Sequence, residues 1–394
     1  MTRPTAGAKL FLLAAAVLLA SRSIAASEPA PPFRGVFFNP QTNADPNFPW
    51  LLHYGDCREE VRAALRELVD TLQVNLVAVF ILIPNTLKDP PHGNESGQAL
   101  EAWANMAFLD HVAAFVDDCH AAGLSVAFDL ADNRWIPHRV DATRHLGQPG
   151  NPWWPVADET PWDEAASWYR QIIEYVESHA AHPEAIAFWC MGGNYQWGGA
   201  EPVLWDNDSL PEVKAHTERF VKHVWPVFRA AGRRPKAAPY ALPIFSNNAY
   251  WMAKSPKERL GAFLNLKQWL VDDLALPPDY WPMTTYPFCD PAPDGVHYLR
   301  EIIAILGEEN AGRILSTDLK GPGHAHELRD SILNVGDASG PDMLQWHFDQ
   351  CMAHGFAGWW VWAYQDAGKE VSGVRARDGA WKQDLVGVIR QSVP

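Results

Sequence analysis

The chain has 394 residues, a formal charge of −15 at neutral pH and 19 tryptophans. Such an acidic chain is repelled by nucleic acid and by anionic membranes, so both are excluded as partners, whereas neutral sugars need no charge to bind. The length exceeds that of an average domain, but barrels with insertions reach it as a single domain.

Residues 1–25 are typical of a secretory signal peptide. Arg3 and Lys9 form a positive start, residues 10–20 are apolar, and Ser23-Ile24-Ala25 supplies the small residues that a signal peptidase reads. The apolar run is shorter than the roughly 20 residues of a membrane-spanning helix, and no later run reaches that length. We therefore predict a secreted or periplasmic protein whose mature chain, residues 26–394, has no membrane insertion. Cleavage removes three cations and no acid, which takes the formal charge to −18.

Apolar runs alternate with amphipathic segments along the mature chain. Continuous apolar runs such as residues 75–83 are typical of strands buried on both faces, and helices show apolar residues three or four positions apart. In chain order the predicted strands are residues 34–39, 75–83, 125–131, 185–191, 236–245, 280–286, 313–319 and 356–364. The predicted helices are residues 58–72, 109–122, 162–181, 211–231, 256–274, 296–306 and 341–354, with a last one starting near residue 380.

Eight strand–helix units predict a (β/α)₈ TIM barrel, formed as one domain by residues 26–394. The alternative is an open, doubly wound sheet, which more often has fewer strands and a Gly-rich first turn. The first predicted turn, GVFFNP, has no such glycine pattern. The segments after the strands are longer than those after the helices, and function in a barrel lies at the carboxyl ends of the strands. We expect the functional site at that end.

Many tryptophans fall in or beside the segments that follow the strands. The flat indole offers a π face to the CH-rich face of a sugar ring, together with one N–H donor. Those we associate with a sugar site are Trp135, Trp153, Trp154, Trp162, Trp197, Trp205, Trp251, Trp360 and Trp362. Four further tryptophans within predicted helices and strands are expected to be core residues: Trp189, Trp225, Trp269 and Trp346.

Residues 182–197, HPEAIAFWCMGGNYQW, resemble the fourth-strand segment of the clan of barrel glycosidases that includes glycoside hydrolase family 5. In that clan the segment reads His-Pro, an apolar strand, and then Trp-Glu-Leu-Gly-Asn-Glu-Pro. Three further segments are similar to the sixth, seventh and eighth strands of the clan: YWPMTTY (280–286), ILSTDLKG (314–321) and FAGWWVWAYQD (356–366). The resemblance covers the chain from about residue 33 to residue 388, mostly as pattern.

The resemblance implies a carbohydrate site and assigns positions within it. Asp318 takes the place of the nucleophile, Asn194 that of the acid/base, and Trp362 that of the tryptophan under the cleavage subsite. On the sixth strand Thr284 takes the place of the clan's His, and Tyr286 that of its Tyr. Two of these positions depart from the clan, because Asn194 is an amide where the clan has Glu and Asp318 is one methylene shorter than Glu.

These departures leave three hypotheses open. A retaining glycosidase needs two carboxyls ~5–5.5 Å apart, and an amide cannot take the part of the acid/base. The first hypothesis is a hydrolase with rearranged carboxylates, in which a wider separation of ~6.5–9.5 Å would admit a water and an inverting mechanism. The second is a barrel that binds glycan without cleaving it. The third is a carbohydrate lyase or transferase. Under the first hypothesis Asp318 works with one of Asp129, Asp132, Glu201 or Asp366.

We select Asp318, Asp129 and Glu201 as candidate catalytic residues, acting on a β-linked poly- or oligosaccharide. Lys320 could stabilise the Asp318 anion. The candidate substrate-binding residues are Asn194, Tyr195, Trp197, Tyr286, Trp135, Trp360, Trp362, Lys320 and His324. We predict no cofactor and no metal, since the sequence has no HExxH motif, no CxxC pair and no nucleotide-binding motif. The five cysteines show no disulfide framework and are expected to be small core residues or to form a single bridge.

Overall fold

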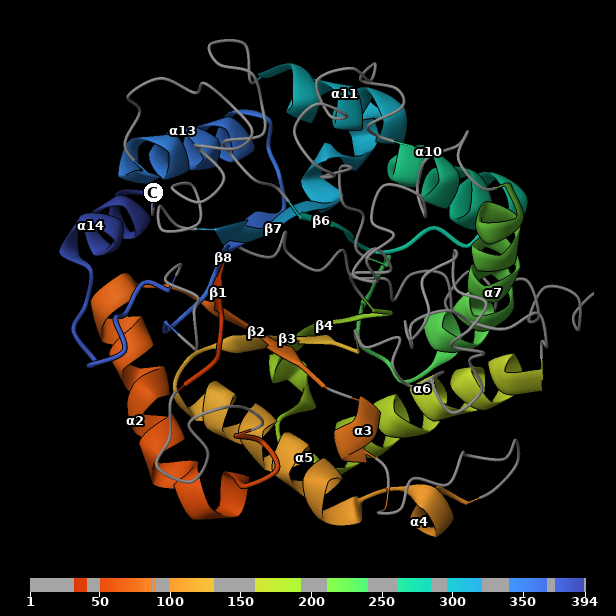
Figure 1. The fold of residues 1–394 in the computed structure, drawn as a ribbon, viewed down its shortest axis with the longest axis horizontal. Coiled ribbons are helices and arrows are strands. Elements are labelled where there is room, and N and C mark those ends of the chain that lie inside the picture. Colours follow the sequence, from red (N-terminus) through yellow and green to blue (C-terminus); the bar gives the residue numbers. More distant parts are fainter. Residues whose placement is uncertain are drawn as a thin grey trace, which may run out of the picture.

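The computed structural model describes the chain as a barrel of strands surrounded by helices (Figure 1). The residues that it describes are 32–40, 50–81, 83–86, 88, 99–130, 160–192, 211–239, 261–284, 296–320, 340–366 and 373–392. The predicted signal peptide lies outside these residues. No helix in the described ranges is both long and apolar enough to cross a membrane.

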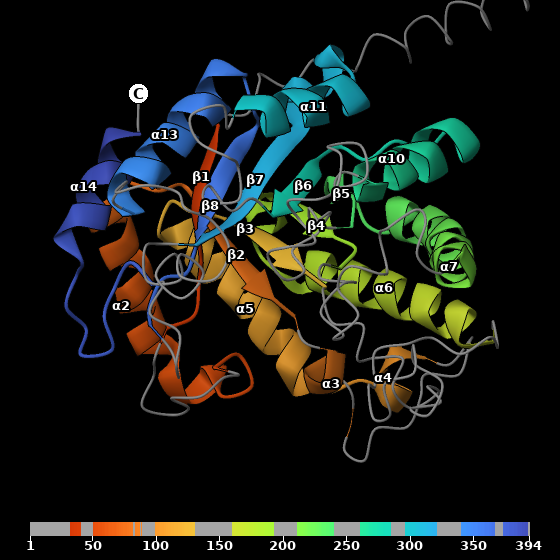
Figure 2. The ribbon, with the colours of Figure 1, turned by 45° about the horizontal axis from the view of Figure 1, so that its top comes forward.

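Eight parallel strands form the barrel. They are β1 (Phe33–Phe37), β2 (Leu76–Phe80), β3 (Ser125–Asp129), β4 (Ile186–Cys190), β5 (Lys236–Ala237), β6 (Trp281–Thr284), β7 (Ile314–Lys320) and β8 (Gly358–Trp362). The hydrogen-bonded order is β5-β4-β3-β2-β1-β8-β7-β6. Between β5 and β6, Ala237 pairs with Tyr280, and the Ala238 N–H donates to the Tyr280 carbonyl at 2.9 Å. The predicted TIM barrel is therefore confirmed (Figure 2).

Helices cover the outside of the barrel (Figure 1). They are α2 (Tyr54–Leu72), α5 (Met106–Ala121), α6 (Thr160–His179), α7 (Pro211–Ala230), α10 (Gly261–Lys267), α11 (Val296–Leu306), α13 (Gly340–Ala353) and α14 (Gln383–Gln391). The predicted helix 256–274 is described from Gly261 and ends in the π-helical turn η3 (Gln268–Asp273). Two short helices after β2, α3 (Ile83–Thr86) and α4 (Leu100–Trp103), were not predicted, because segments of four residues show no periodicity.

The apolar side chains form two separate clusters. The inner cluster fills the barrel and includes Phe33, Phe37, Phe188 and Trp360. The outer cluster lies between strands and helices and contains three of the four predicted core tryptophans, Trp189, Trp225 and Trp269, whereas Trp346 is half-buried. It also contains Trp162, so the expectation that Trp162 belongs to the sugar site is wrong: its side chain, on α6, is buried. The four described cysteines are buried thiols, as expected of small core residues: Cys57, Cys119, Cys190 and Cys351.

One polar contact is buried between β7 and α13. The Ser316 hydroxyl of β7 lies 2.8 Å from Nε2 of His347 on α13, and both side chains are fully enclosed. Burial lowers the pKa of His347 to about 3, because the charged imidazolium would lose its hydration there. The ring is therefore neutral in the folded protein at any moderate pH.

This buried histidine predicts a pH-dependent loss of stability. In the unfolded chain the imidazole titrates near its ordinary pKa of about 6.5, so below that pH the unfolded state binds a proton that the folded state does not. The free energy of unfolding is therefore unaffected by the titration of His347 above about pH 6.5, and it decreases as the pH falls from 6.5 toward 3. Between pH 7 and pH 5 we expect about 2 kcal/mol of this loss to come from His347, measured by urea unfolding of the wild type against His347→Gln. His53→Gln, which removes an exposed histidine, is the control variant. Equal slopes for the wild type and His347→Gln would contradict the prediction.

Candidate functional site at the carboxyl ends of the strands

The carboxyl ends of β1, β2 and β8 bring three aromatic rings together. The indole of Trp362 stacks on Phe37 with ring centroids 4.1 Å apart and an interplanar angle of 17°. Phe80 lies 4.4 Å from Phe37 and 5.7 Å from Trp362, again between ring centroids. Each of these residues lies two positions after another inward-facing residue of its strand. Because side chains alternate between the two faces of a strand, all three rings point into the barrel. Trp362 is only half-buried, so part of this aromatic cluster remains accessible.

Asp129 ends β3 on the same side of the sheet. In the parallel register it pairs with Phe80 of β2 and with Cys190 of β4, and it is 2 % exposed. Backbone hydrogen bonds continue past it on both sides, from Ile81 N–H to the Asp129 carbonyl and from Leu130 N–H to the Cys190 carbonyl. A carboxyl is thus fixed on a rigid strand end beside the aromatic cluster. Such a combination can stack an apolar sugar face and hold or move a proton next to it.

Asp318 and Lys320 belong to β7, of which the structure describes the backbone at these two positions. Lys320 pairs with Trp362 of β8, and Thr317, next to Asp318, pairs with Thr284 of β6. The sheet order puts β7 and β3 four strands apart in either direction round the barrel, so Asp318 and Asp129 come from opposite walls.

Trp360 lies deeper than Trp362. It is fully buried in the inner cluster, where its ring is 6.1 Å from that of Phe188. Residues two apart on a strand share a face but differ in depth by about 6.6 Å along the barrel axis before tilt. The depth of Trp360 favours a packing role, and its contact with a ligand stays a prediction.

The polar residues that follow β1 and β8 are engaged in holding these strand ends together. Asn39 donates to the Gln365 carbonyl at 2.9 Å and accepts from the Gln365 N–H at 3.1 Å. The carboxyl of Asp366 accepts from the Gly373 N–H and forms an ion pair of 2.9 Å with Lys382. Asp366 is 6 % exposed. These contacts favour a structural role for Asp366 over that of a catalytic partner.

The other predicted site residues lie outside the described part of the chain: Glu201, Asn194, Tyr195, Trp197, Tyr286, Trp135 and His324. Phe37 and Phe80, which form the aromatic cluster with Trp362, were not among the predicted site residues. Their spacing of two places Phe37 on the same face as Gly35, and Phe80 on the same face as Ala78, but the sequence alone does not say which face of these strands is the inner one.

No family model and no curated protein matches the sequence. The fold is similar to solved structures of barrel glycosidases. An exo-β-1,4-mannosidase, Op5Man5 from Opitutaceae bacterium strain TAV5, has a TM-score of 0.55 at 13 % identity, over 92 % of this chain and 59 % of its own. This chain thus spans less than two thirds of that mannosidase.

Two further structures are similar over most of their length. A GH5_18 protein from Bifidobacterium longum subsp. infantis has a TM-score of 0.57 at 13 % identity, over 92 % of this chain and 78 % of its own. A broad-specificity GH5-4 endoglucanase from Clostridium acetobutylicum has a TM-score of 0.51 at 13 % identity, over 83 % of this chain and 88 % of its own. At this identity the likeness shows the fold: this chain shares the barrel of family 5 glycoside hydrolases and of related glycosidases.

Proposed function

We propose that the protein is a glycoside-hydrolase-like barrel that hydrolyses O-glycosidic bonds in a β-linked poly- or oligosaccharide. The observation that carries the proposal is the half-buried Trp362 stacked on Phe37, with the Asp129 carboxyl on the same side of the sheet. Stacked aromatic rings recognise sugar faces, and a carboxyl beside them supplies acid/base chemistry. The signal-like residues 1–25 support export to the cell surface, medium or periplasm, where polymeric glycans occur.

We infer that Asp318 acts with a second carboxyl from another strand end, Asp129 or Glu201. Asp318 and Asp129 come from opposite walls of the barrel, and a wide separation favours an inverting mechanism in which a water fits between the carboxyls. The names of similar structures include a β-1,4-mannosidase and an endoglucanase, so β-1,4-linked manno-oligosaccharides and β-linked gluco-oligosaccharides are the first substrates to test.

A second candidate function is carbohydrate binding without cleavage. It is favoured by Asn194, an amide at the position where the resembled clan has its acid/base Glu. A panel of β-linked oligosaccharides separates the two functions. Turnover by the wild type that is lost in Asp318→Asn would support hydrolysis, and micromolar binding with no turnover would support the binding function. Neither turnover nor binding on the panel would contradict both.

The aromatic cluster gives a prediction that holds for either function. Trp362→Ala should weaken oligosaccharide binding by about 10-fold, because an aromatic stacking contact contributes about 0.5–1.5 kcal/mol beyond its buried area. Isothermal titration calorimetry measures the change. Trp346→Ala is the matched control, since Trp346 is also half-buried but lies on α13, in the helical layer outside the strands. Equal affinity for the wild type and Trp362→Ala would remove Trp362 from the binding site.

A further inference from the structure

Two histidines and a glutamate gather at the opposite end of the barrel from the candidate sugar site. His120 lies in the last turn of α5, which leads into β3, and Glu184 lies in the 3₁₀ turn η2 (Pro183–Ala185), which leads into β4. His182 directly precedes that turn. The amino ends of β3 and β4 are therefore joined by side chains that belong to segments 62 residues apart in sequence.

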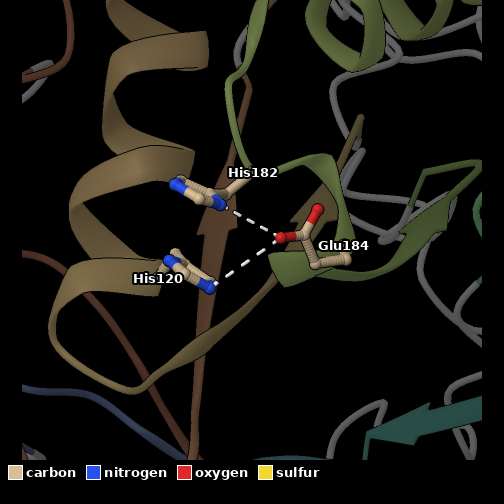
Figure 3. A group of neighbouring side chains, drawn as sticks. All are labelled: His120, His182 and Glu184. Atoms are coloured by element: carbon tan, nitrogen blue, oxygen red, sulfur yellow. Dashed lines mark hydrogen bonds and ion pairs between the residues drawn. The ribbon is translucent and has the colours of Figure 1, made fainter.

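One nitrogen of each ring faces the same carboxylate oxygen (Figure 3). Nδ1 of His182 lies 3.1 Å from Oε1 of Glu184, and Nε2 of His120 lies 3.8 Å from the same oxygen. The two rings are stacked with centroids 3.8 Å apart and an interplanar angle of 6°. One ligand atom from each of the three residues lies within 4.8 Å of the others.

From this arrangement we propose a binding site for a divalent transition metal ion of the zinc type, held by His120, His182 and Glu184. Zinc binds imidazole nitrogen and carboxylate oxygen at ~2.0–2.2 Å, so ligand atoms around a tetrahedral ion are about 3.4 Å apart. The two nitrogen–oxygen distances to Glu184, 3.1 Å and 3.8 Å, lie on either side of this value. The nitrogens of the two rings need to approach each other by about 1.4 Å at most to reach the tetrahedral spacing. Because the rings are stacked nearly parallel, they must also rotate out of the stack for their lone pairs to converge on one ion, and both rings are exposed to solvent.

The backbone segments that carry the three residues are fixed before any ion binds. The Asp117 carboxylate on α5 accepts from the His182 N–H at 2.8 Å, and this bond fixes the segment before β4 against α5. Pro183 restricts the backbone at the start of the turn that carries Glu184. The end of α5 is fixed by the hydrogen bond from the Gly123 N–H to the His120 carbonyl. Metal binding would therefore restrict the rotation of the three side chains but order little additional backbone.

The ligand set decides which ions can bind. Two imidazoles and one carboxylate suit Zn²⁺, Ni²⁺ or Cu²⁺, whereas Ca²⁺ and Mg²⁺ prefer oxygen ligands alone. Three protein ligands leave the fourth zinc position to water or to an external group. His120, His182 and Glu184 have 44 %, 45 % and 59 % of their side-chain surface exposed, so an ion can enter directly from solvent. A bound ion would link α5 to the start of β4. This site is independent of the proposed sugar chemistry, because it lies at the other end of the strands.

Calorimetric titration of the full chain with ZnCl₂ tests the site. We expect His120→Gln and His182→Gln each to weaken one zinc-binding event at least about tenfold, since loss even of an outer partner of a metal ligand costs about 10–100-fold. His53→Gln, which removes an exposed histidine on α2's amino end, should leave that event unchanged. MgCl₂ should not compete. The chain holds 15 histidines, so the comparison between variants, not the presence of zinc binding, carries the result. Unchanged zinc affinity and stoichiometry in both variants would overturn the proposal.

A second measurement uses the wild-type chain and does not depend on how a variant folds. Diethyl pyrocarbonate modifies accessible imidazoles, and mass spectrometry locates the products. Zinc should protect His120 and His182 together while His53 stays reactive. Reaction of His120 and His182 at the same rate with and without zinc would overturn the site.

Discussion

Replacing Asp318 by Asn should lower kcat/KM on a hydrolysed β-linked oligosaccharide by about 10²- to 10⁴-fold, the usual contribution of a group that transfers a proton or attacks in the transition state. The substitution keeps the size of the side chain and removes its charge and its proton chemistry. Asp318 stands near the carboxyl end of β7, one residue after Thr317, which pairs with β6, and two before Lys320, which pairs with Trp362. The measurement is initial-rate kinetics at several substrate concentrations, so that kcat and KM are separated.

Asp129→Asn and Asp366→Asn make a matched pair for this experiment. Asp129 lies beside the aromatic cluster and should behave as Asp318 does if it is the second carboxyl. Asp366 forms an ion pair with Lys382, so Asp366→Asn should lower stability and leave kcat nearly unchanged. NMR of the first-formed anomer reports the stereochemistry, and inversion would fit carboxyls ~6.5–9.5 Å apart. Full activity in Asp318→Asn would remove Asp318 from the mechanism.

The barrel was predictable from the sequence because its signals are local. Each strand is a short apolar run, and in each helix apolar residues recur every three or four positions. The alternation of strands and helices implies parallel pairing of the strands. Helix 296–306 and α11 have the same bounds, and the predicted strand 313–319 differs from β7 by one residue at each end. The prediction was poorest at β5, where Pro239 interrupts the predicted run and the described strand is two residues long.

The side-chain arrangement of the site was less predictable, because its signals are not local. Strands buried on both faces are apolar throughout, so the sequence does not separate the inner Phe37 from the outer Phe38. Trp360 and Trp362 share a face and a residue type, yet only Trp362 is accessible at the strand end. The candidate metal site is another case, since His120 and His182 meet only because α5 and the segment before β4 end side by side.

The importance of Gly358 for stability was likewise not predictable from the sequence. It begins β8 and pairs with Phe33 of β1 and Leu315 of β7, at one of the seams of the barrel. A Cβ placed there would lie 2.1 Å from the Phe33 carbonyl oxygen and 2.6 Å from the Phe33 Cβ, and the residue has φ of 153°. Backbone atoms cannot rotate away, so the two strands would have to separate. Nothing in the sequence distinguishes this glycine from the others.

We therefore expect Gly358→Ala to lower the free energy of unfolding by about 3 kcal/mol, the upper part of the range for overpacking. Gly387→Ala is the matched control, because Gly387 lies within α14 and a Cβ there meets nothing within 4 Å. That change should raise the free energy of unfolding by about 0.5–1 kcal/mol, since alanine favours helix over glycine. Urea unfolding of both variants measures the two effects, and opposite signs from the same substitution would identify strand approach at Phe33 as the cause. An unchanged free energy of unfolding in Gly358→Ala would contradict the close contact between β1 and β8 at Phe33 and Gly358.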